Sequence, residues 1–190
     1  YQTVKLVKSQ VPSDKTMLGF AGSPWTVATY MVAGEGSRDQ HETRALAYRD
    51  RGAFQAIIDA ITDVTIEYLA GQILAGAEAV QLFDSWAGSL APAEFERWVI
   101  APNARIVAAI AKRFPHVPVI GFPKGAGEKL PAYARETGVQ ALGLATLDGK
   151  LGLGHRLLDL VGDVLELGQL RLGQEVQHGR LVGEPFRMGL

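Results

Sequence analysis

The residues best suited to chemistry stand in two short stretches rich in Gly, Ser and Trp. Residues 21–25 read AGSPW, with Tyr30 five positions later, and residues 83–90 read FDSWAGSL. Ser23 is a good N-cap and Pro24 suits a first helical position, so a helix should start here. The bare N–H groups of such a start attract anions, and Trp25 and Tyr30 would lie beside it. The alternative is a plain strand-to-helix turn whose two aromatic residues belong to the core.

Composition limits the classes of protein this can be. The 190 residues are 47% hydrophobic, carry a net charge of −1 and include no Cys. This is ordinary composition for one globular domain, and it argues against a nucleic-acid partner. The lack of Cys excludes disulfides, thiolate zinc sites and Cys nucleophiles, and it suits a cytoplasmic location. No apolar run predicts a membrane span, and the start at Tyr1 rather than Met suits a fragment.

Short apolar runs alternate with helical patterns along the first 145 residues. The expected strands are 17–21, 79–83, 117–122 and 140–144, and the expected helices are 1–11, 24–33, 51–75, 92–114 and 127–137. Such alternation is typical of an α/β fold with a parallel sheet. Four units fit either a small doubly wound domain or half of an eight-stranded barrel. In both architectures the functional residues follow the carboxyl ends of the strands.

The composition changes after residue 150. Residues 151–190 contain no Ala, Ser, Thr, Ile or Lys, whereas the preceding part is rich in Ala. We therefore expect one domain over 1–150 and an atypical tail rich in Leu, Gly and Arg over 151–190. Some helix could form in this tail around 155–167, with disorder as the alternative.

Common metal and cofactor motifs are incomplete. The HETRA stretch at 41–45 lacks the second His of a zinc-protease helix, and GAGEKL at 125–130 lacks the last Gly of a dinucleotide-binding loop. The four His residues are scattered, which favours surface positions for each: His41, His116, His155 and His178. We expect neither a metal nor a cofactor.

Four segments together resemble one family. The stretch GFAGSPWTVATYMVAGEG at 19–36 closely resembles the signature of uroporphyrinogen decarboxylases, and AGAEAVQLFDSWAGSLAP at 75–92 resembles that family's next strand and loop. VPVIGFPKGAG at 117–127 and GVQALGL at 138–144 continue the likeness in order. The resemblance implies a (β/α)8 TIM barrel, here a partial barrel of about four βα units. It also implies a homodimer that works without metal or cofactor.

The family's reaction gives roles to three residues by this resemblance. It converts uroporphyrinogen III, a tetrapyrrole polycarboxylate, to coproporphyrinogen III by removing four acetate carboxyls in haem biosynthesis. Tyr30 and Ser85 match residues that contact substrate carboxylates, and Phe83 matches a residue lining the same cleft. A core Tyr, a turn-forming Ser and a core Phe are the structural alternatives. Asp84 should point away from the side of Phe83, which favours a structural role.

Other family motifs are missing, so the resemblance supplies no catalytic residue in this chain. The paired arginines of RQAGR and the essential aspartate are absent, as are the later motifs QGNLDP and NLGHG, and His155 receives no role. We expect the isolated chain to self-associate through unpaired strand edges and to lack turnover. Two alternatives stay open: a catalytically dead half-barrel that only binds, and a cobalamin-dependent methyltransferase of the same superfamily, whose usual zinc ligands include Cys.

Overall fold

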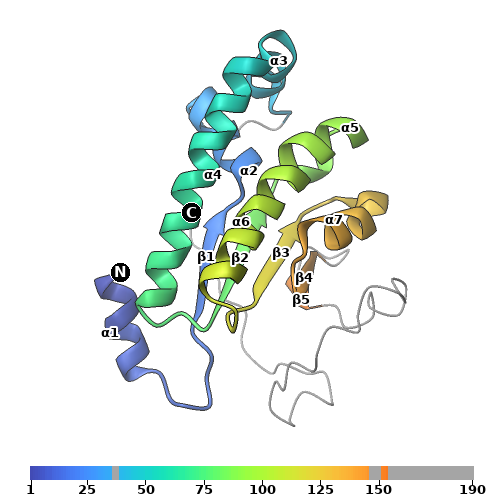
Figure 1. Cartoon of the computed structure of the whole chain (residues 1–190). Coiled ribbons are helices and arrows are strands. Elements are labelled where there is room, and N and C mark those ends of the chain that lie inside the picture. The colour runs from blue at the N-terminus through green and yellow to red at the C-terminus, as the bar shows by residue number, and fades with distance from the viewer. Residues whose placement is uncertain (36–38, 146–150, 154–190) are drawn as a thin grey trace.

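Four parallel strands lie side by side in their sequence order. The computed structural model describes residues 1–35, 39–145 and 151–153. The strands are β1 (Leu18–Gly22), β2 (Ala79–Asp84), β3 (Val119–Pro123) and β4 (Ala141–Ala145). The order β1-β2-β3-β4 is that of a barrel, whereas a doubly wound sheet reverses its order partway. The predicted α/β partial barrel is confirmed, and the doubly wound alternative is excluded (Figure 1).

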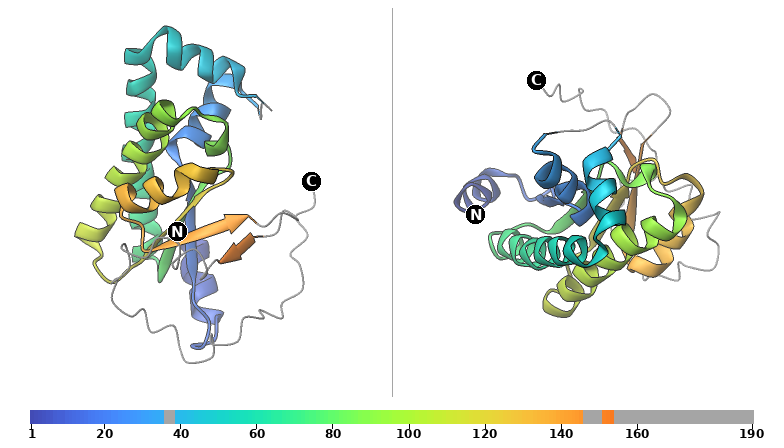
Figure 2. Two further views of the ribbon diagram at one scale, coloured as in Figure 1. Left: turned by 90° about the vertical axis from the view of Figure 1, so that its right-hand side faces the viewer. Right: turned by 90° about the horizontal axis from the view of Figure 1, so that it is seen from above.

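One helix precedes the sheet, and the others connect its strands along one side (Figure 2). The helices are α1 (Gln2–Gln10), α2 (Pro24–Ala33), α3 (His41–Arg49), α4 (Arg51–Leu74), α5 (Pro92–Phe95), α6 (Ala101–Arg113) and α7 (Leu130–Thr137). A π-helical segment, Glu96–Ile100, joins α5 to α6, so the helix predicted over 92–114 forms as one continuous rod. No helix among the described residues combines the length and the hydropathy needed to cross a bilayer.

Two elements were not expected from the sequence. Helix α3 has only two buried residues, Thr43 and Ala47, so its sequence shows little apolar periodicity. A short fifth strand, β5 (Leu151–Leu153), pairs antiparallel with β4. The sheet therefore extends just past the expected domain boundary at residue 150. The helix considered around 155–167 lies outside the described residues.

The two faces of the sheet differ because side chains alternate along each strand. Val80 and Leu82 of β2 point toward the helices and are fully buried. There they meet an aromatic cluster in which Phe54 packs edge-on against Trp25, at 5.9 Å, and against Trp98, at 4.9 Å between ring centroids. Trp25 is completely buried in this layer. The hydrophobic core therefore lies between the sheet and the helices.

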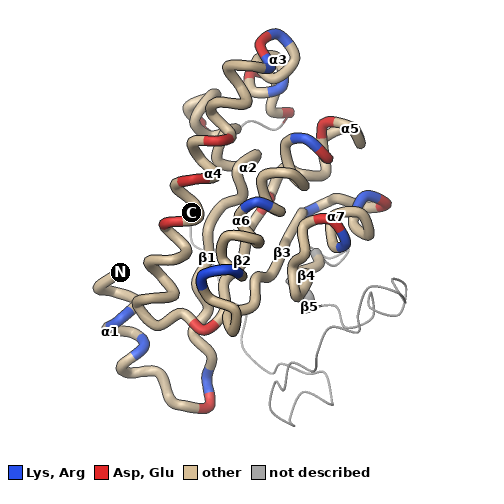
Figure 3. The backbone as a smooth tube through the Cα atoms, in the orientation of Figure 1, with Lys and Arg blue, Asp and Glu red and all other residues tan. Residues whose placement is uncertain are grey.

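Ion pairs fasten the outer surfaces of α4 and α6 together. Arg105 of α6 bonds to Asp59 and Asp63 of α4, and Arg113 bonds to Glu67. Figure 3 shows the acidic positions along α4 and the basic positions on α6. These pairs are exposed, so each contributes at most about 1 kcal/mol. They fix the register of the two helices more than they stabilise the fold.

The outer edge of β1 is partly closed by a side chain. Gln72 of α4 accepts a hydrogen bond from Phe20 N at 3.0 Å and donates one to Phe20 O at 2.9 Å. Gly19 permits this approach, because a Cβ there would lie 2.9 Å from Gln72 Oε1. A buried amide thus takes the place of a neighbouring strand at Phe20.

We predict that Gln72→Leu lowers the free energy of unfolding by about 1–3 kcal/mol, because both Phe20 backbone groups lose their partner. Urea unfolding followed by circular dichroism measures this change. The matched control is Gln55→Leu on the exposed side of α4, where the amide bonds only to Asp59, and it should stay within about 0.5 kcal/mol of the parent. Equal losses in the two variants would contradict the edge-closing role of Gln72.

Candidate functional site

The loops that follow β1, β2 and β3 are bound to one another at the carboxyl end of the sheet. Ser23 N donates to Phe83 O at 2.8 Å, and Lys124 N donates to Asp84 O at 2.9 Å. Gly88 N in turn donates to Lys124 O at 3.0 Å. These backbone bonds place the loop after β2 between its two neighbours. Residues from three strand ends therefore form one continuous surface.

The turn after β1 matches the plain strand-to-helix alternative more closely than an open anion site. Helix α2 begins at Pro24 as predicted, but Ser23 makes no capping hydrogen bond through its side chain. Ser23, Pro24 and Trp25 are all buried. Trp25 belongs to the core, as this alternative requires, whereas Tyr30 is 45% exposed. The start of α2 is thus closed, and Tyr30 is the residue of this stretch that reaches the surface.

Asp84 occupies the last position of β2 and is fully buried. It points to the helix side, opposite Phe83, as the strand alternation predicts. Thr26 Oγ1 donates to Asp84 Oδ1 at 2.7 Å, and the same hydroxyl accepts a hydrogen bond from Trp86 N at 3.4 Å. Trp25 Nε1 adds a bond to Trp86 O at 3.3 Å. Two consecutive residues of α2 therefore hold the beginning of the loop after β2.

Burial controls the charge of this carboxyl group. Desolvation raises the pKa of Asp84 to about 7, although the hydrogen bonds from Thr26 and from the Trp86 backbone act in the opposite direction. Asp84 Oδ2 has no hydrogen-bond partner in the described part of the chain. Burial, with the Asp84 carboxyl as a second cause, also raises the pKa of Tyr133. The carboxyl group is therefore neutral over most of the acidic pH range.

Phe83 lies on the face of the sheet opposite the helices. Its ring packs edge-on between Phe20, at 5.9 Å, and Phe122, at 5.7 Å between centroids. Gly143 of β4 lets Phe122 approach, since a Cβ there would lie 2.9 Å from the ring. Phe20 is 59% exposed, whereas Phe122 is almost fully buried. Three rings thus make an apolar row across this inner face.

Ser85 and Tyr30 belong to the loop after β2 and to helix α2, which both begin at the carboxyl end of the sheet. Ser85 directly follows β2 and is half-buried. Tyr30 lies one helical turn beyond Thr26, and at 100° per residue it projects about 40° from the direction of Thr26. Val27, at about 100°, packs against Gly22 at the end of β1. Tyr30 therefore projects between the side that contacts Asp84 and the side that contacts β1.

Sequence reasoning did not identify three further residues at this end. Thr26 is one, and Lys129 is another: its Nζ donates to Gly88 O at 3.2 Å and to Leu90 O at 2.8 Å. The third, Lys124, directly follows β3 and is exposed. Lys124 could have been identified from the sequence, because it stands between Pro123 and Gly125 just after a predicted strand. The long-range partners of Thr26 and Lys129 leave no such signal.

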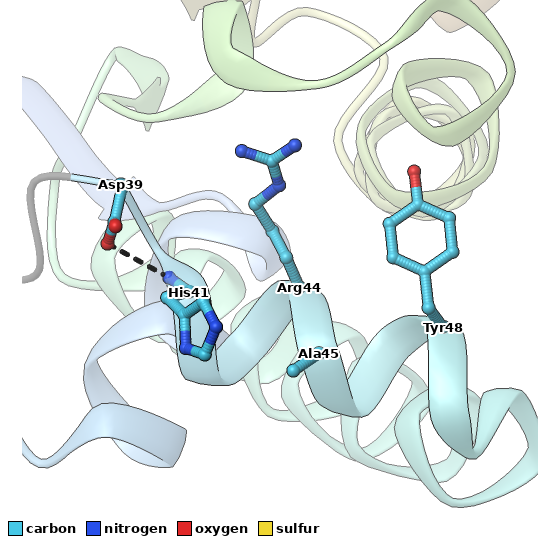
Figure 4. A pocket seen from close by; sticks show the side chains of 5 residues that line it. All are labelled: Asp39, His41, Arg44, Ala45 and Tyr48. Atoms are coloured by element: carbon cyan, nitrogen blue, oxygen red, sulfur yellow. Dashed lines mark hydrogen bonds between the residues drawn. The ribbon is translucent and has the colours of Figure 1, made fainter.

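A pocket of about 330 Å³ lies against α3, apart from these loops. Asp39, His41, Arg44, Ala45 and Tyr48 line it, and His41 N donates to Asp39 Oδ1 at 3.2 Å (Figure 4). His41 and His116 are both exposed, as predicted, whereas His155 and His178 lie outside the described residues. None of the residues expected at the site lines this pocket.

Comparisons with known proteins agree on one family. A family model described as "Uroporphyrinogen decarboxylase (URO-D)" matches residues 1–153. Proteins named uroporphyrinogen decarboxylase from Novosphingobium aromaticivorans and Rhizorhabdus wittichii are 78% and 70% identical over 144 residues. That match covers 76% of this chain and 42% of each relative, so the chain spans less than half of their length.

A solved structure gives the same architecture at lower identity. A methyltransferase from Methanosarcina mazei matches with a TM-score of 0.63 and 16% identity, covering 74% of this chain and 39% of that one. This likeness shows the fold alone. It carries no argument for methyl-transfer chemistry.

We predict that Asp84 makes stability depend on pH. Its pKa in the folded state, about 7, lies above the ordinary value of 3.8, so between these values the folded protein keeps a proton that the unfolded chain releases. The contribution of Asp84 to the free energy of unfolding is therefore fully present below about pH 4. It is lost as the pH rises to about 7, by roughly 4 kcal/mol in total.

Asp84→Asn removes this titration while keeping the shape of the side chain. Urea unfolding of parent and variant at pH 4.5, 6 and 8 measures the difference. The variant should gain stability relative to the parent as the pH rises. A difference that is the same at all three pH values would show that Asp84 is charged throughout this range.

Proposed function

Because this chain belongs to the uroporphyrinogen decarboxylase family, we propose that the carboxyl end of its sheet forms part of the tetrapyrrole site of such an enzyme. The whole reaction converts uroporphyrinogen III to coproporphyrinogen III in porphyrin biosynthesis. The family match over residues 1–153 is the observation that carries this proposal. The names of the relatives, and the gathering of strand-end loops around Ser85, support it.

The proposed chemistry relies on the substrate's own ring. Protonation of an electron-rich pyrrole turns it into an electron sink. The bond between the acetate methylene carbon and the carboxyl carbon then breaks. Carbon dioxide leaves, and the electron pair of the broken bond moves into the ring. A proton then adds to the exocyclic methylene to give a methyl group, and the ring releases the proton that it first took up, which restores the pyrrole. The protein's task is to bind a polyanion, exclude water and manage protons.

The residues at this end suit a polyanion with an apolar centre. We assign hydrogen bonds to substrate carboxylates to Tyr30, which is exposed, and to Ser85, which is half-buried. Phe83 and its neighbouring rings offer an apolar wall to the tetrapyrrole. Lys124, exposed after β3, adds positive charge at the same edge.

For the chain as it stands we propose binding without turnover. A hydrogen bond to a charged group contributes roughly 1.5–3 kcal/mol, whereas enzymatic acceleration requires about 8–23 kcal/mol. Hydroxyl groups from Tyr30 and Ser85 cannot supply that difference. This proposal corresponds to the catalytically dead half-barrel that only binds, here as a member of the decarboxylase family. The homodimer and the cytoplasmic location implied by the family stay proposals for the whole protein.

Tyr30→Phe and Ser85→Ala should each weaken binding of uroporphyrin, a stable octacarboxylate, by about tenfold. Titration of the porphyrin's fluorescence with the 190-residue chain measures the dissociation constant. The matched controls are Tyr68→Phe on α4 and Ser9→Ala on α1, two exposed positions whose loss should change the constant by less than about twofold. If the site variants bind as tightly as the controls, the assignment of Tyr30 and Ser85 fails.

We also propose that the chain self-associates through its inner sheet face. Phe20 is 59% exposed and Leu18, two positions before it on the same face, is 42% exposed, which leaves large apolar side chains uncovered on one strand. Phe20→Thr should shift the association equilibrium toward monomer by about tenfold in sedimentation equilibrium. Val64→Thr on α4 is the control, because Val64 is 69% exposed on the helical surface. Equal behaviour of both variants would place the association elsewhere.

A further inference from the structure

We propose that Thr26 and Asp84 are a positioning pair that sets Tyr30 relative to Ser85 for tetrapyrrole binding. Neither residue needs to touch the substrate for this role. The inference rests on the proposed function, because it assigns Tyr30 and Ser85 to the same ligand. It adds a side-chain contribution to their relative placement, beside the backbone bond from Ser23 N to Phe83 O that joins the start of α2 to β2.

The first observation is the double use of one hydroxyl group. Thr26 Oγ1 donates to Asp84 Oδ1 at 2.7 Å and accepts from Trp86 N at 3.4 Å. Ser85 stands between these two partners in the chain. The Thr26 hydroxyl therefore contacts the side chain of the residue before Ser85 and the backbone N–H of the residue after it, which restrains the chain around the serine.

The second observation is the place of Tyr30 on the same helix. Thr26 and Tyr30 are four residues apart in α2, so they are neighbours on one helical face. Whatever fixes the rotation of α2 at Thr26 also fixes the direction of Tyr30. The hydrogen bond to Asp84 thus connects the helix that carries Tyr30 directly to the end of β2, where the loop that carries Ser85 begins.

The third observation is burial, which makes the link stiff. Thr26 is 6% exposed and Asp84 is fully buried, so water does not compete for their hydrogen bond. A shifted helix would leave the Asp84 carboxyl and the Thr26 hydroxyl without partners in a dry environment, which is costly. Oδ1 still accepts from Thr26 when a proton sits on Oδ2, although less strongly than a carboxylate oxygen would, so the link persists with the neutral carboxyl that the raised pKa of Asp84 implies.

Lys124 N closes the arrangement from the other side by donating to Asp84 O at 2.9 Å. Asp84 is therefore held by β3 through its main chain and by α2 through its side chain. Loss of the side-chain bond alone should leave the sheet intact. This separation makes the proposal testable without unfolding the protein.

The test is uroporphyrin binding to the 190-residue chain and three threonine variants. Thr26→Val removes the hydroxyl at nearly constant volume and should raise the dissociation constant about tenfold. Thr26→Ser restores the hydroxyl and should stay within about threefold of the parent. Thr62→Val is the matched control: Thr62 is equally buried, but its hydroxyl bonds only to Ile58 O within α4, so binding should be retained.

A double-mutant cycle distinguishes positioning from general stability. Once Tyr30→Phe has removed the tyrosine hydroxyl, Thr26→Val should weaken binding by no more than about threefold further, because part of its effect acts through Tyr30. Independent effects would multiply to about a hundredfold. Circular dichroism of each variant confirms that the helices and strands are retained.

Three results would overturn the inference. If Tyr30→Phe and Ser85→Ala weaken binding while Thr26→Val does not, the site stands but the pair does not position it. If Thr62→Val weakens binding as much as Thr26→Val, the effect is loss of stability. If Tyr30→Phe and Ser85→Ala leave binding unchanged, the proposed function fails and the inference fails with it.

Discussion

The hydrogen bond from Thr26 to Asp84 is a buried side-chain link between two segments that backbone pairing has already brought together. It connects the helix after β1 to the end of β2, across 58 positions of sequence. A buried carboxyl group at the end of a central strand requires a hydrogen-bond partner. Burial raises the pKa of Asp84 to about 7, which favours its uncharged form. The loop after β2 begins at that point, so its course depends on how Asp84 is held. The geometry of the candidate site therefore follows from a polar group on the core side of the sheet.

The rest of the loop is held by contacts of a different kind. Gly88 approaches Gly125 so closely that a Cβ would lie 2.5 Å from Gly125 O. Lys129 reaches over the Phe95 ring, at 5.1 Å, to bond two carbonyl groups of the loop. The ammonium group of Lys129 donates to the two loop carbonyl groups, while the apolar part of its side chain lies along the ring. Ser85 thus leaves a strand that is fixed at one end by Thr26 and is followed by a loop fixed by Lys129.

The two faces of the sheet have different requirements, and this explains where chemistry can occur. On the helix side, Val80 and Leu82 belong to the same buried core as Trp25, Phe54 and Trp98. On the inner side, the phenylalanine row is covered only in part. In a complete (β/α)8 barrel such a face lines the interior. The same pleat that buries Asp84 among the helices therefore turns Phe83 to the inner face, next to the carboxyl end of β2.

The sequence by itself determined the elements and their family. Apolar runs and helix signals located four strands and most helices to within a few residues, and alternation along β2 separated Phe83 from Asp84. Four segments in order, at 19–36, 75–92, 117–127 and 138–144, identified the family, which comparison confirmed. Helix α3 was not predicted, because its buried residues, Thr43 and Ala47, are small or polar and do not form a helical pattern of apolar residues.

Only the tertiary structure decided which polar side chains hold these elements together. Gln72 closes the edge of β1 across 52 positions, and Thr26 reaches Asp84 across 58. Neither residue type nor local spacing marks these partners, because a hydrogen bond between distant segments depends on the packing that brings them together. The sequence determined which residue types stand after each strand and in what order along the chain. The packing of α2 and α4 against the strands decided how those residues face one another.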